Sequence, residues 1–114
     1  MHYLGKQARV VATLPDGTER SLIQIDDWDL RWQNIYLLRE PLYLPAGSRI
    51  DAWFTYDNSE ENPDNPHLPP KPIQWGWKSE EEMAELWMTV VPDDWDQRDS
   101  YIDASYQSWL RAAD

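Results

Sequence analysis

Cysteine is absent from this chain of 114 residues, so neither a disulfide framework nor a thiolate metal site is possible. Basic residues are scarce as well: 10 Lys and Arg stand against 21 Asp and Glu, which gives a formal net charge of -11. Such a surplus of negative charge argues against nucleic acid or an anionic membrane surface as a partner. We therefore expect a protein that binds neither of them.

Long apolar runs are also missing. No stretch approaches the roughly 20 apolar residues that cross a bilayer, and the start, Met1–Val10, lacks the apolar centre of a secretory signal peptide. What the chain does contain is eight tryptophans and nine prolines, which favour β structure with long loops over a helical bundle. Its length fits one domain with a core of its own.

Several segments carry the residue patterns of β-strands. Residues 6–14 and 18–25 are joined by Pro15-Asp16-Gly17, in which Pro presets φ, Asp bonds its own backbone and Gly supplies a positive φ. We therefore predict a hairpin there. Alternating or mixed apolar patterns predict further strands over 32–44, 49–56 and 85–91. Six or seven short strands separated by turns are typical of an antiparallel β-sandwich.

The period of the apolar residues changes at the end of the chain. Residues 99–113 predict an amphipathic helix, capped by Asp99 or Ser100, that packs on the sandwich or on a partner. Four residues form its apolar stripe: Ile102, Tyr106, Trp109 and Leu110. The expected fold is all-β: an antiparallel jelly-roll-like β-sandwich over 1–92 and, within the same domain, a C-terminal helical extension over 93–114.

Residues 57–73 form a long stretch rich in proline and asparagine with no strand or helix pattern. Loops of this length inside a domain are uncommon and are usually functional or disordered. Two interpretations stay open: an ordered surface loop that covers a sheet edge, or a loop that forms part of a binding site. Its acidic first half, 57–64, leaves calcium binding as a further alternative, but it lacks the ligand spacing of an EF-hand.

Few residues have side chains suited to catalysis or metal binding. Met83 follows an acidic turn and precedes an apolar run, where a thioether either fills a gap in the core or serves as a soft ligand for Cu(I). The two histidines are His2 and His67, and a lone histidine more often has a structural or surface role. The acidic run 80–82 is typical of a solvated turn, and nothing marks two carboxylates as an acid–base pair.

The tryptophans suggest a function of another class. Exposed tryptophans on a β-sandwich form stacking platforms for sugars, although most of the eight are expected in the core. A non-catalytic β-sandwich module that binds carbohydrate or a protein partner is therefore the alternative hypothesis.

A series of short motifs, in a fixed order over residues 1 to about 92, carries a resemblance to a known family. These motifs are Met1-His2…Gly5-Lys6, Pro15-Asp16-Gly17, Trp32-Gln33, Asp57-Asn58-Ser59, Asn62-Pro63, Asn65-Pro66, Trp75-Gly76 and Glu81-Glu82-Met83. Together they resemble the C-terminal domain of the copper type II, ascorbate-dependent monooxygenases, the superfamily of the peptidylglycine and dopamine hydroxylating enzymes. The bacterial members of that superfamily are the closer match.

The resemblance implies a copper site. His2 matches the second histidine of the family's His-x-His motif, Met83 matches its thioether ligand, and His67 is a candidate substitute ligand. Two imidazoles and one thioether stabilise Cu(I) and leave a position open for dioxygen. The first motif histidine would precede Met1, so the resemblance implies a fragment or a degenerate copper-binding module of a larger oxidoreductase. We expect no activity from the isolated chain, and a periplasmic or secreted parent protein with further domains.

Overall fold

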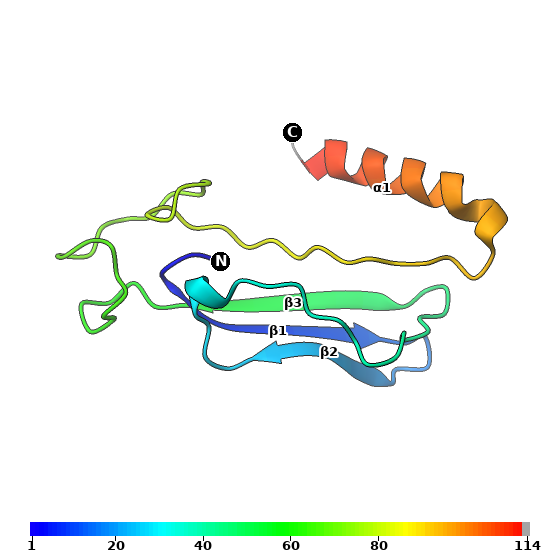
Figure 1. The fold of residues 1–114 in the computed structure, drawn as a ribbon, viewed down its shortest axis with the longest axis horizontal. Coiled ribbons are helices and arrows are strands. Elements are labelled where there is room, and N and C mark those ends of the chain that lie inside the picture. The colour runs from blue at the N-terminus through cyan, green and yellow to red at the C-terminus, as the bar shows by residue number, and fades with distance from the viewer. Residues whose placement is uncertain (113–114) are drawn as a thin grey trace.

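An antiparallel sheet of three strands lies at the centre of the structure, a computed structural model that describes the backbone of residues 1–112 and the side chains of residues 1–107. The strands are β1 (Gly5–Thr13), β2 (Glu19–Ile25) and β3 (Arg49–Tyr56). Two short 3-10 helices, η1 (Leu30–Trp32) and η2 (Trp95–Gln97), and one α-helix, α1 (Arg98–Ala112), complete the regular elements. Figure 1 shows the chain leaving β3 into a long loop and returning beside the sheet to α1.

Strand β1 occupies the middle of the sheet, in the order β2-β1-β3, and is antiparallel to both neighbours. Its residue Val10 lies opposite Ile23 of β2 and Ala52 of β3, and Ala8 is paired in the same way with Ile25 and Phe54. Because residues that pair across strands project from the same face, one face of the sheet is apolar. The register shifts between Val10 and Val11 on the β2 side.

The predicted hairpin between β1 and β2 is confirmed, and its turn has the expected chemistry. The backbone N–H of Leu14 donates to the carbonyl oxygen of Thr18 at 2.8 Å, and the Asp16 carboxylate accepts from the Thr18 N–H at 2.8 Å. Gly17 has a φ of 84°, a left-handed conformation that a side chain would strain. The turn residues therefore fix the register of this pair of strands.

The core lies along β1 and the residues just before it. The buried apolar side chains are those of Met1, Leu4, Ala8, Val10, Val11 and Ala12. A Cβ added to Gly5 would lie 2.8 Å from the Cβ atom of Met1 and 2.9 Å from Cδ1 of Trp28, so the chain entering β1 has no room for a side chain there. The indole N–H of Trp28 donates to the His2 carbonyl oxygen at 3.2 Å and holds the Trp28 side chain against the start of the chain.

Two of the predicted strands are wrong. Residues 85–91 run extended toward α1 (Figure 1), and residues 32–44 are irregular, with the end of η1 at Trp32 and a bend at 39–40. Within the described chain neither segment joins a sheet. Their apolar side chains are exposed: 89% of the surface of Leu37 and 80% of that of Trp87 face solvent. Alternation shows that a segment suits a sheet, whereas a strand also needs a neighbouring backbone for its hydrogen bonds. Three paired strands are therefore present across residues 1–112, rather than six or seven.

The C-terminal helix is confirmed as α1, but its start differs from the prediction. Residues Trp95–Gln97 form η2 first, and the Asp94 carboxylate caps that turn by accepting from the Asp96 N–H at 3.0 Å. Asp99 therefore lies in the first turn of α1 rather than at its cap.

The apolar stripe of α1 does not pack on the sheet as far as its side chains are described. Ile102 and Tyr106 are both more than half exposed. The side chains of Trp109 and Leu110, and residue 113, lie outside the described residues. Along residues 1–112, no helix combines the length and apolar character that crossing a bilayer requires.

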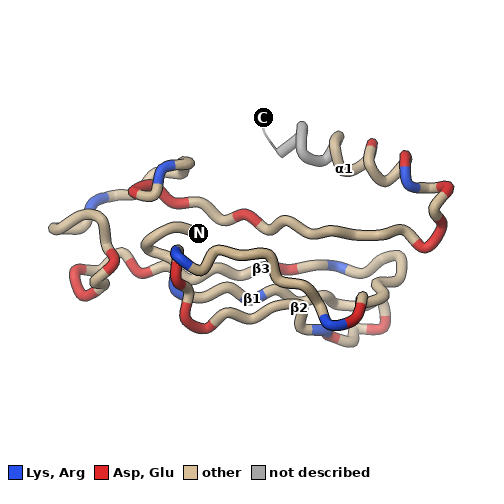
Figure 2. The backbone as a smooth tube through the Cα atoms, viewed as in Figure 1, with Lys and Arg blue, Asp and Glu red and all other residues tan. Residues whose placement is uncertain are grey.

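Charged residues are spread over the periphery. Figure 2 shows acidic residues along the loops, around the start of α1 and at the hairpin ends, with fewer basic residues between them. The ion pairs Arg31–Asp29 and Arg49–Asp51, each at 2.8 Å, link side chains two residues apart. Exposed pairs of this kind contribute little to folding, so the stability rests mainly on the small apolar core around β1.

Stability should therefore depend strongly on the middle of β1. Val10 is 1% exposed, and Val10→Ala removes two buried methyl groups, which we expect to lower the free energy of unfolding by about 2 kcal/mol. Urea denaturation measures the change. The matched control is Val91→Ala, because Val91 is 73% exposed and its truncation should change stability by less than about 0.5 kcal/mol. Equal effects of the two substitutions would contradict this placement of the core.

Candidate functional site

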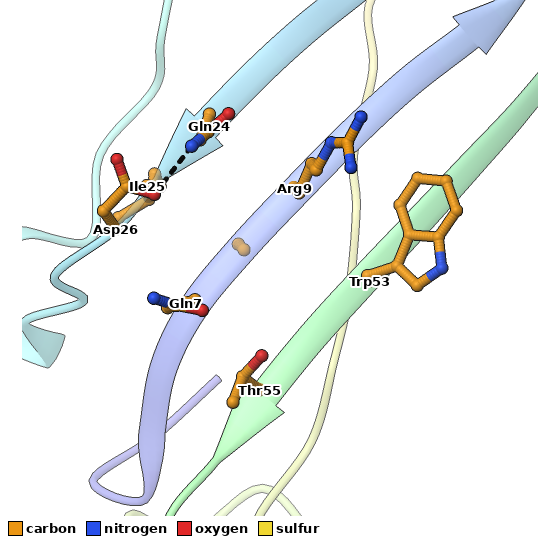
Figure 3. Close-up of a pocket in the computed structure, with 8 residues that line it drawn as sticks. Gln7, Arg9, Gln24, Ile25, Asp26, Trp53 and Thr55 are labelled. Atoms are coloured by element: carbon orange, nitrogen blue, oxygen red, sulfur yellow. Dashed lines mark hydrogen bonds between the residues drawn. The ribbon is translucent and has the colours of Figure 1, made fainter.

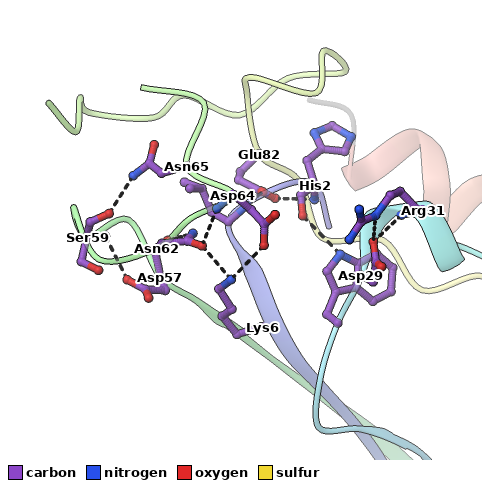
Figure 4. A network of polar contacts seen from close by, with 12 residues as sticks. His2, Lys6, Asp29, Arg31, Asp57, Ser59, Asn62, Asp64, Asn65 and Glu82 are labelled. Atoms are coloured by element: carbon purple, nitrogen blue, oxygen red, sulfur yellow. Dashed lines mark hydrogen bonds and ion pairs between the residues drawn. The ribbon is translucent and has the colours of Figure 1, made fainter. Parts of the chain in front are cut away.

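One carboxylate joins the beginning of the chain to the segment before Met83. Glu82 Oε2 accepts from the backbone N–H of His2 at 2.8 Å, and Glu82 Oε1 accepts from the N–H of Leu4 at 2.8 Å. Figure 4 shows Glu82 reaching His2 from a separate stretch of chain. Hydrogen bonds to an ionised carboxylate are about twice as strong as neutral ones. The two ends of the site are thus held together by a charged group that accepts from His2 and Leu4 and, at 3.3 Å, also from the backbone N–H of Met83.

A tight turn over residues 78–81 holds Glu82 in place. The N–H of Gly76 donates to the Glu82 carbonyl oxygen at 3.1 Å, and the N–H of Glu82 donates to the Gln74 carbonyl oxygen at 3.1 Å. Between them, the N–H of Glu81 donates to the Lys78 carbonyl oxygen at 2.9 Å. A Cβ at Gly76 would collide with the Glu81 side chain. The Trp-Gly and Glu-Glu-Met motifs are therefore two sides of one small structural unit.

The imidazole of His2 is buried, with 8% of its residue surface exposed. Its Nδ1 lies 2.9 Å from the carbonyl oxygen of Glu81. Because a carbonyl oxygen can only accept, Nδ1 of the neutral ring carries the proton and Nε2 keeps its lone pair. Donation of the other ring N–H to a carbonyl is the usual arrangement of a histidine that ligates a metal.

Met83 follows Glu82 directly and is partly buried, so it is not one of the core side chains around β1. Its carbonyl oxygen accepts from the hydroxyl of Tyr56, at the end of β3, at 2.9 Å. Burial, together with the nearby negative charge of Glu82, raises the pKa of Tyr56 to about 12. The structure thus brings the backbone segments of His2 and Met83 together, and the Glu82 carboxylate links them.

His67 lies on the long loop, and its backbone N–H donates to the Asn65 side chain at 3.0 Å. His67 lines a shallow pocket of about 210 Å³ together with Gln74, Glu80 and Glu81. Glu81 is also the residue whose carbonyl oxygen faces His2. Within the part of the chain whose side chains are described, no hydrogen bond or ion pair joins the His67 ring to His2. Through Glu81, which lines the same pocket and faces His2, His67 lies beside the candidate site.

Asparagine side chains order the long loop, residues 57–73. Asn62 is buried; its Nδ2 donates to the Asp57 carbonyl oxygen at 2.7 Å, and its Oδ1 accepts from the Lys6 ammonium group at 2.7 Å. The Lys6 ammonium group also lies 3.6 Å from the Asp64 carboxylate, as Figure 4 shows. Hydrogen bonds from Ser59, through its side chain and its backbone, lower the pKa of Asp57. The loop is therefore ordered by its own side chains, whereas a role in covering a sheet edge or in binding stays a prediction.

Our sequence analysis missed the roles of Lys6, Asn62 and Glu82, although all three lie within the motifs of the resemblance. A lysine and an asparagine 56 positions apart carry no local sign that they bond. For calcium, the relevant finding is that no group of three His, Asp or Glu side chains in the described residues is placed to hold a metal ion. The donors that the resemblance implies are the imidazole of His2 and the thioether of Met83, with His67 as a candidate substitute.

Comparison of the chain with protein-family models, with curated proteins and with solved structures gave no match. The resemblance to the copper monooxygenases therefore stays a prediction, which rests on the motifs of the sequence.

Replacing the linking carboxylate should loosen the start of the chain. In Glu82→Gln an amide NH₂ replaces one of the two oxygens and faces a backbone N–H, so one of the two bonds to His2 or Leu4 is lost. We expect a loss of about 1–3 kcal/mol in stability and faster hydrogen exchange at Leu4, measured by NMR. Glu80→Gln, on an exposed neighbouring residue, is the control. Unchanged exchange at Leu4 in Glu82→Gln would contradict the linking role.

The phenol of Tyr56 should lose its proton at a higher pH than a free tyrosine side chain. With a pKa of about 12 in the folded protein against 10.0 in a free side chain, the folded state keeps a proton that the unfolded chain has already lost. The folded state is therefore progressively destabilised as the pH rises from 10 to about 12. Phenolate absorbance of the wild type should show a late step that Tyr56→Phe lacks. Loss of an early step in that variant would contradict the placement of the hydroxyl.

Proposed function

We propose that this chain is a copper-binding module related to the C-terminal domain of copper type II monooxygenases, with His2 Nε2 and Met83 Sδ as ligands. The observation that carries the proposal is the hydrogen bond between His2 Nδ1 and the Glu81 carbonyl oxygen, two residues before Met83. It leaves Nε2 as the free nitrogen of a buried ring, next to the segment that carries the thioether. Both ligand assignments follow from the sequence motifs of the resemblance.

The chemistry of the two donors suits copper in its reduced state. Thioether sulfur is a soft ligand that selects Cu(I), and imidazole nitrogen binds copper as well. A copper ion held there would supply one-electron chemistry and a position for dioxygen. Hard cations such as calcium prefer six to eight oxygen ligands, which a set of one nitrogen and one sulfur does not provide.

The residues around the two donors have positioning roles. Glu82 holds the backbone of His2 and Leu4, so the imidazole is attached to a fixed backbone. Tyr56 holds the carbonyl oxygen of Met83 through its hydroxyl. Such outer contacts commonly change metal affinity 10–100-fold when they are removed, because they orient the ligands. His67, on the neighbouring loop, is a candidate third donor.

A site with two firm donors binds copper weakly and leaves the ion incompletely coordinated. We therefore propose a partial or degenerate module of a larger oxidoreductase rather than a self-sufficient enzyme. Its parent would be periplasmic or secreted and would carry further domains. The jelly-roll sandwich expected over residues 1–92 belongs to the same proposal, in which a second sheet would cover the apolar face around Ala52 and Phe54.

A non-catalytic binding module is the second candidate function. The observation in its favour is the half-exposed indole of Trp53, which lines a pocket on the sheet. Tryptophan is a large side chain that is highly buried on average, so an exposed ring beside a pocket suits ligand stacking.

Anaerobic titration with Cu(I) against a colorimetric chelator tests the copper proposal. We expect the wild type to bind one Cu(I), and Met83→Ala and His2→Gln each to weaken binding at least about tenfold. Met88→Ala is the matched control, because Met88 is an exposed methionine on the extended segment. A variant with one histidine added before Met1 should bind more tightly. X-ray absorption of the copper-loaded wild type should show a sulfur ligand that Met83→Ala lacks.

Two outcomes would overturn the copper proposal. One is the absence of Cu(I) binding in the wild type and in the variant with the added histidine. The other is an equal loss of affinity in Met83→Ala and Met88→Ala, which would mean that the methionines bind copper without a formed site.

A further inference from the structure

The second face of the sheet carries polar side chains in register across all three strands. Arg9 of β1 lies opposite Gln24 of β2 and Trp53 of β3, and Gln7 of β1 lies opposite Thr55 of β3. Paired residues project from the same face, so these five side chains share one surface. This face is opposite the apolar one that carries Val10. We call these five residues the Arg9–Trp53 face.

The Arg9–Trp53 face is hollowed. A pocket of about 230 Å³ opens there between the three strands, and Asp26, at the end of β2, closes one side of it. Figure 3 shows the side chains standing around the hollow, with the indole ring of Trp53 at one end and Gln24 and Asp26 at the other. The pocket is smaller than the usual site for a drug-sized ligand, and its size suits one ring of a longer molecule.

Trp53 and Arg9 form one end of this pocket. The guanidinium carbon of Arg9 lies 5.5 Å from the centre of the Trp53 ring, which is close enough for a cation–π contact. Trp53 is 51% exposed, so part of the indole surface is free to contact a ligand. Among the residues whose side chains are described, no carboxylate forms an ion pair with Arg9, so its N–H donors are open to a ligand.

The other end of the pocket offers a fixed acceptor. The side-chain N–H of Gln24 donates to Asp26 Oδ1 at 2.7 Å, and this bond orients both groups. The second oxygen of Asp26 and the carbonyl oxygen of Gln24 can accept from hydroxyl groups, whereas Arg9 can only donate. A ligand that fits must therefore present an apolar flat surface to the indole and hydroxyl groups that both donate and accept at its edge.

We propose that the Arg9–Trp53 face binds a neutral oligosaccharide whose rings carry equatorial hydroxyl groups, one ring of which stacks on Trp53. A pyranose ring with equatorial hydroxyl groups presents C–H bonds to the negative face of an aromatic ring and hydroxyl groups at its rim. The inference names a ligand class and a site for the second candidate function, and it does not depend on copper binding at His2.

Charge and size separate this ligand from the other candidates. The chain carries a net charge of -11, and Asp26 adds a carboxylate within the pocket itself, so an acidic polysaccharide is disfavoured. A protein partner would normally bury a surface far larger than this pocket. A neutral sugar is not repelled by the negative charge, and one sugar ring is small enough for the pocket. Because one stacked ring and a few exposed hydrogen bonds are involved, we expect a Kd of about 1 mM or weaker for a short oligosaccharide.

NMR titration of the isotope-labelled full chain with cellohexaose tests the proposal. We expect saturable shifts of the Trp53 indole N–H and of the Arg9 and Gln24 signals. Trp53→Ala should weaken binding at least about tenfold, and Trp53→Phe, which keeps a smaller ring, should weaken it less. Trp87→Ala is the matched control, since Trp87 is an exposed tryptophan on the extended segment and lies outside the pocket. The dispersion of the amide signals reports whether each variant is folded.

Three results would overturn the proposal. The first is the absence of saturable shifts at Trp53 in the wild type. The second is equal binding by the wild type and by folded Trp53→Ala or Trp53→Phe. The third is tighter binding of an oligogalacturonate than of cellohexaose, which would mean that Arg9 selects a carboxylate instead of a neutral sugar. None of these results bears on Cu(I) binding, so the two proposals can fail separately.

Discussion

The hydrogen bonds of the Glu82 carboxylate are the interaction on which the arrangement of this protein depends. They tie the backbone of His2 and Leu4, at the entrance to the central strand, to a turn about 80 residues away in the sequence. The same contact positions the buried imidazole, the thioether segment and the Tyr56 hydroxyl around one corner. Because the carboxylate is an acceptor only, it serves backbone N–H groups that would otherwise be left unpaired as β1 begins.

Local sequence chemistry was sufficient for the parts of the fold that are decided locally. The Pro15-Asp16-Gly17 turn fixes the β1–β2 hairpin, and the alternation of residues 49–56 matches β3 at both ends. Residues 85–91 alternate equally well, yet they pair with no strand in the described structure. Pairing depends on which backbone lies alongside, and the period of a segment contains no information about that. The helix was predictable from its stripe, whereas its first residue depended on the Asp94 turn before it.

Some residues of the candidate sites were predictable from the sequence, and others were not. The resemblance named His2 and Met83, and the structure shows why an acidic residue sits between them in space: Glu82 is a backbone acceptor. The bond from Lys6 to Asn62 could not be inferred, because neither residue is unusual in its own surroundings. The Arg9–Trp53 face also escaped prediction. Its residues come from three strands, and only the observed register brings them into one row.

The open edge of β3 has a consequence for the protein in solution. Within the described sheet β3 pairs on one side alone, and the exposed apolar segment 85–91 is suited to sheet pairing. Such edges and segments promote the growth of aggregates between copies of a chain. The net charge of -11 opposes this by mutual repulsion, which acts over about 10 Å at 0.1 M salt and over about 3 Å at 1 M. The acidic surface therefore keeps copies of the chain apart by charge repulsion, and this repulsion weakens as the salt concentration rises.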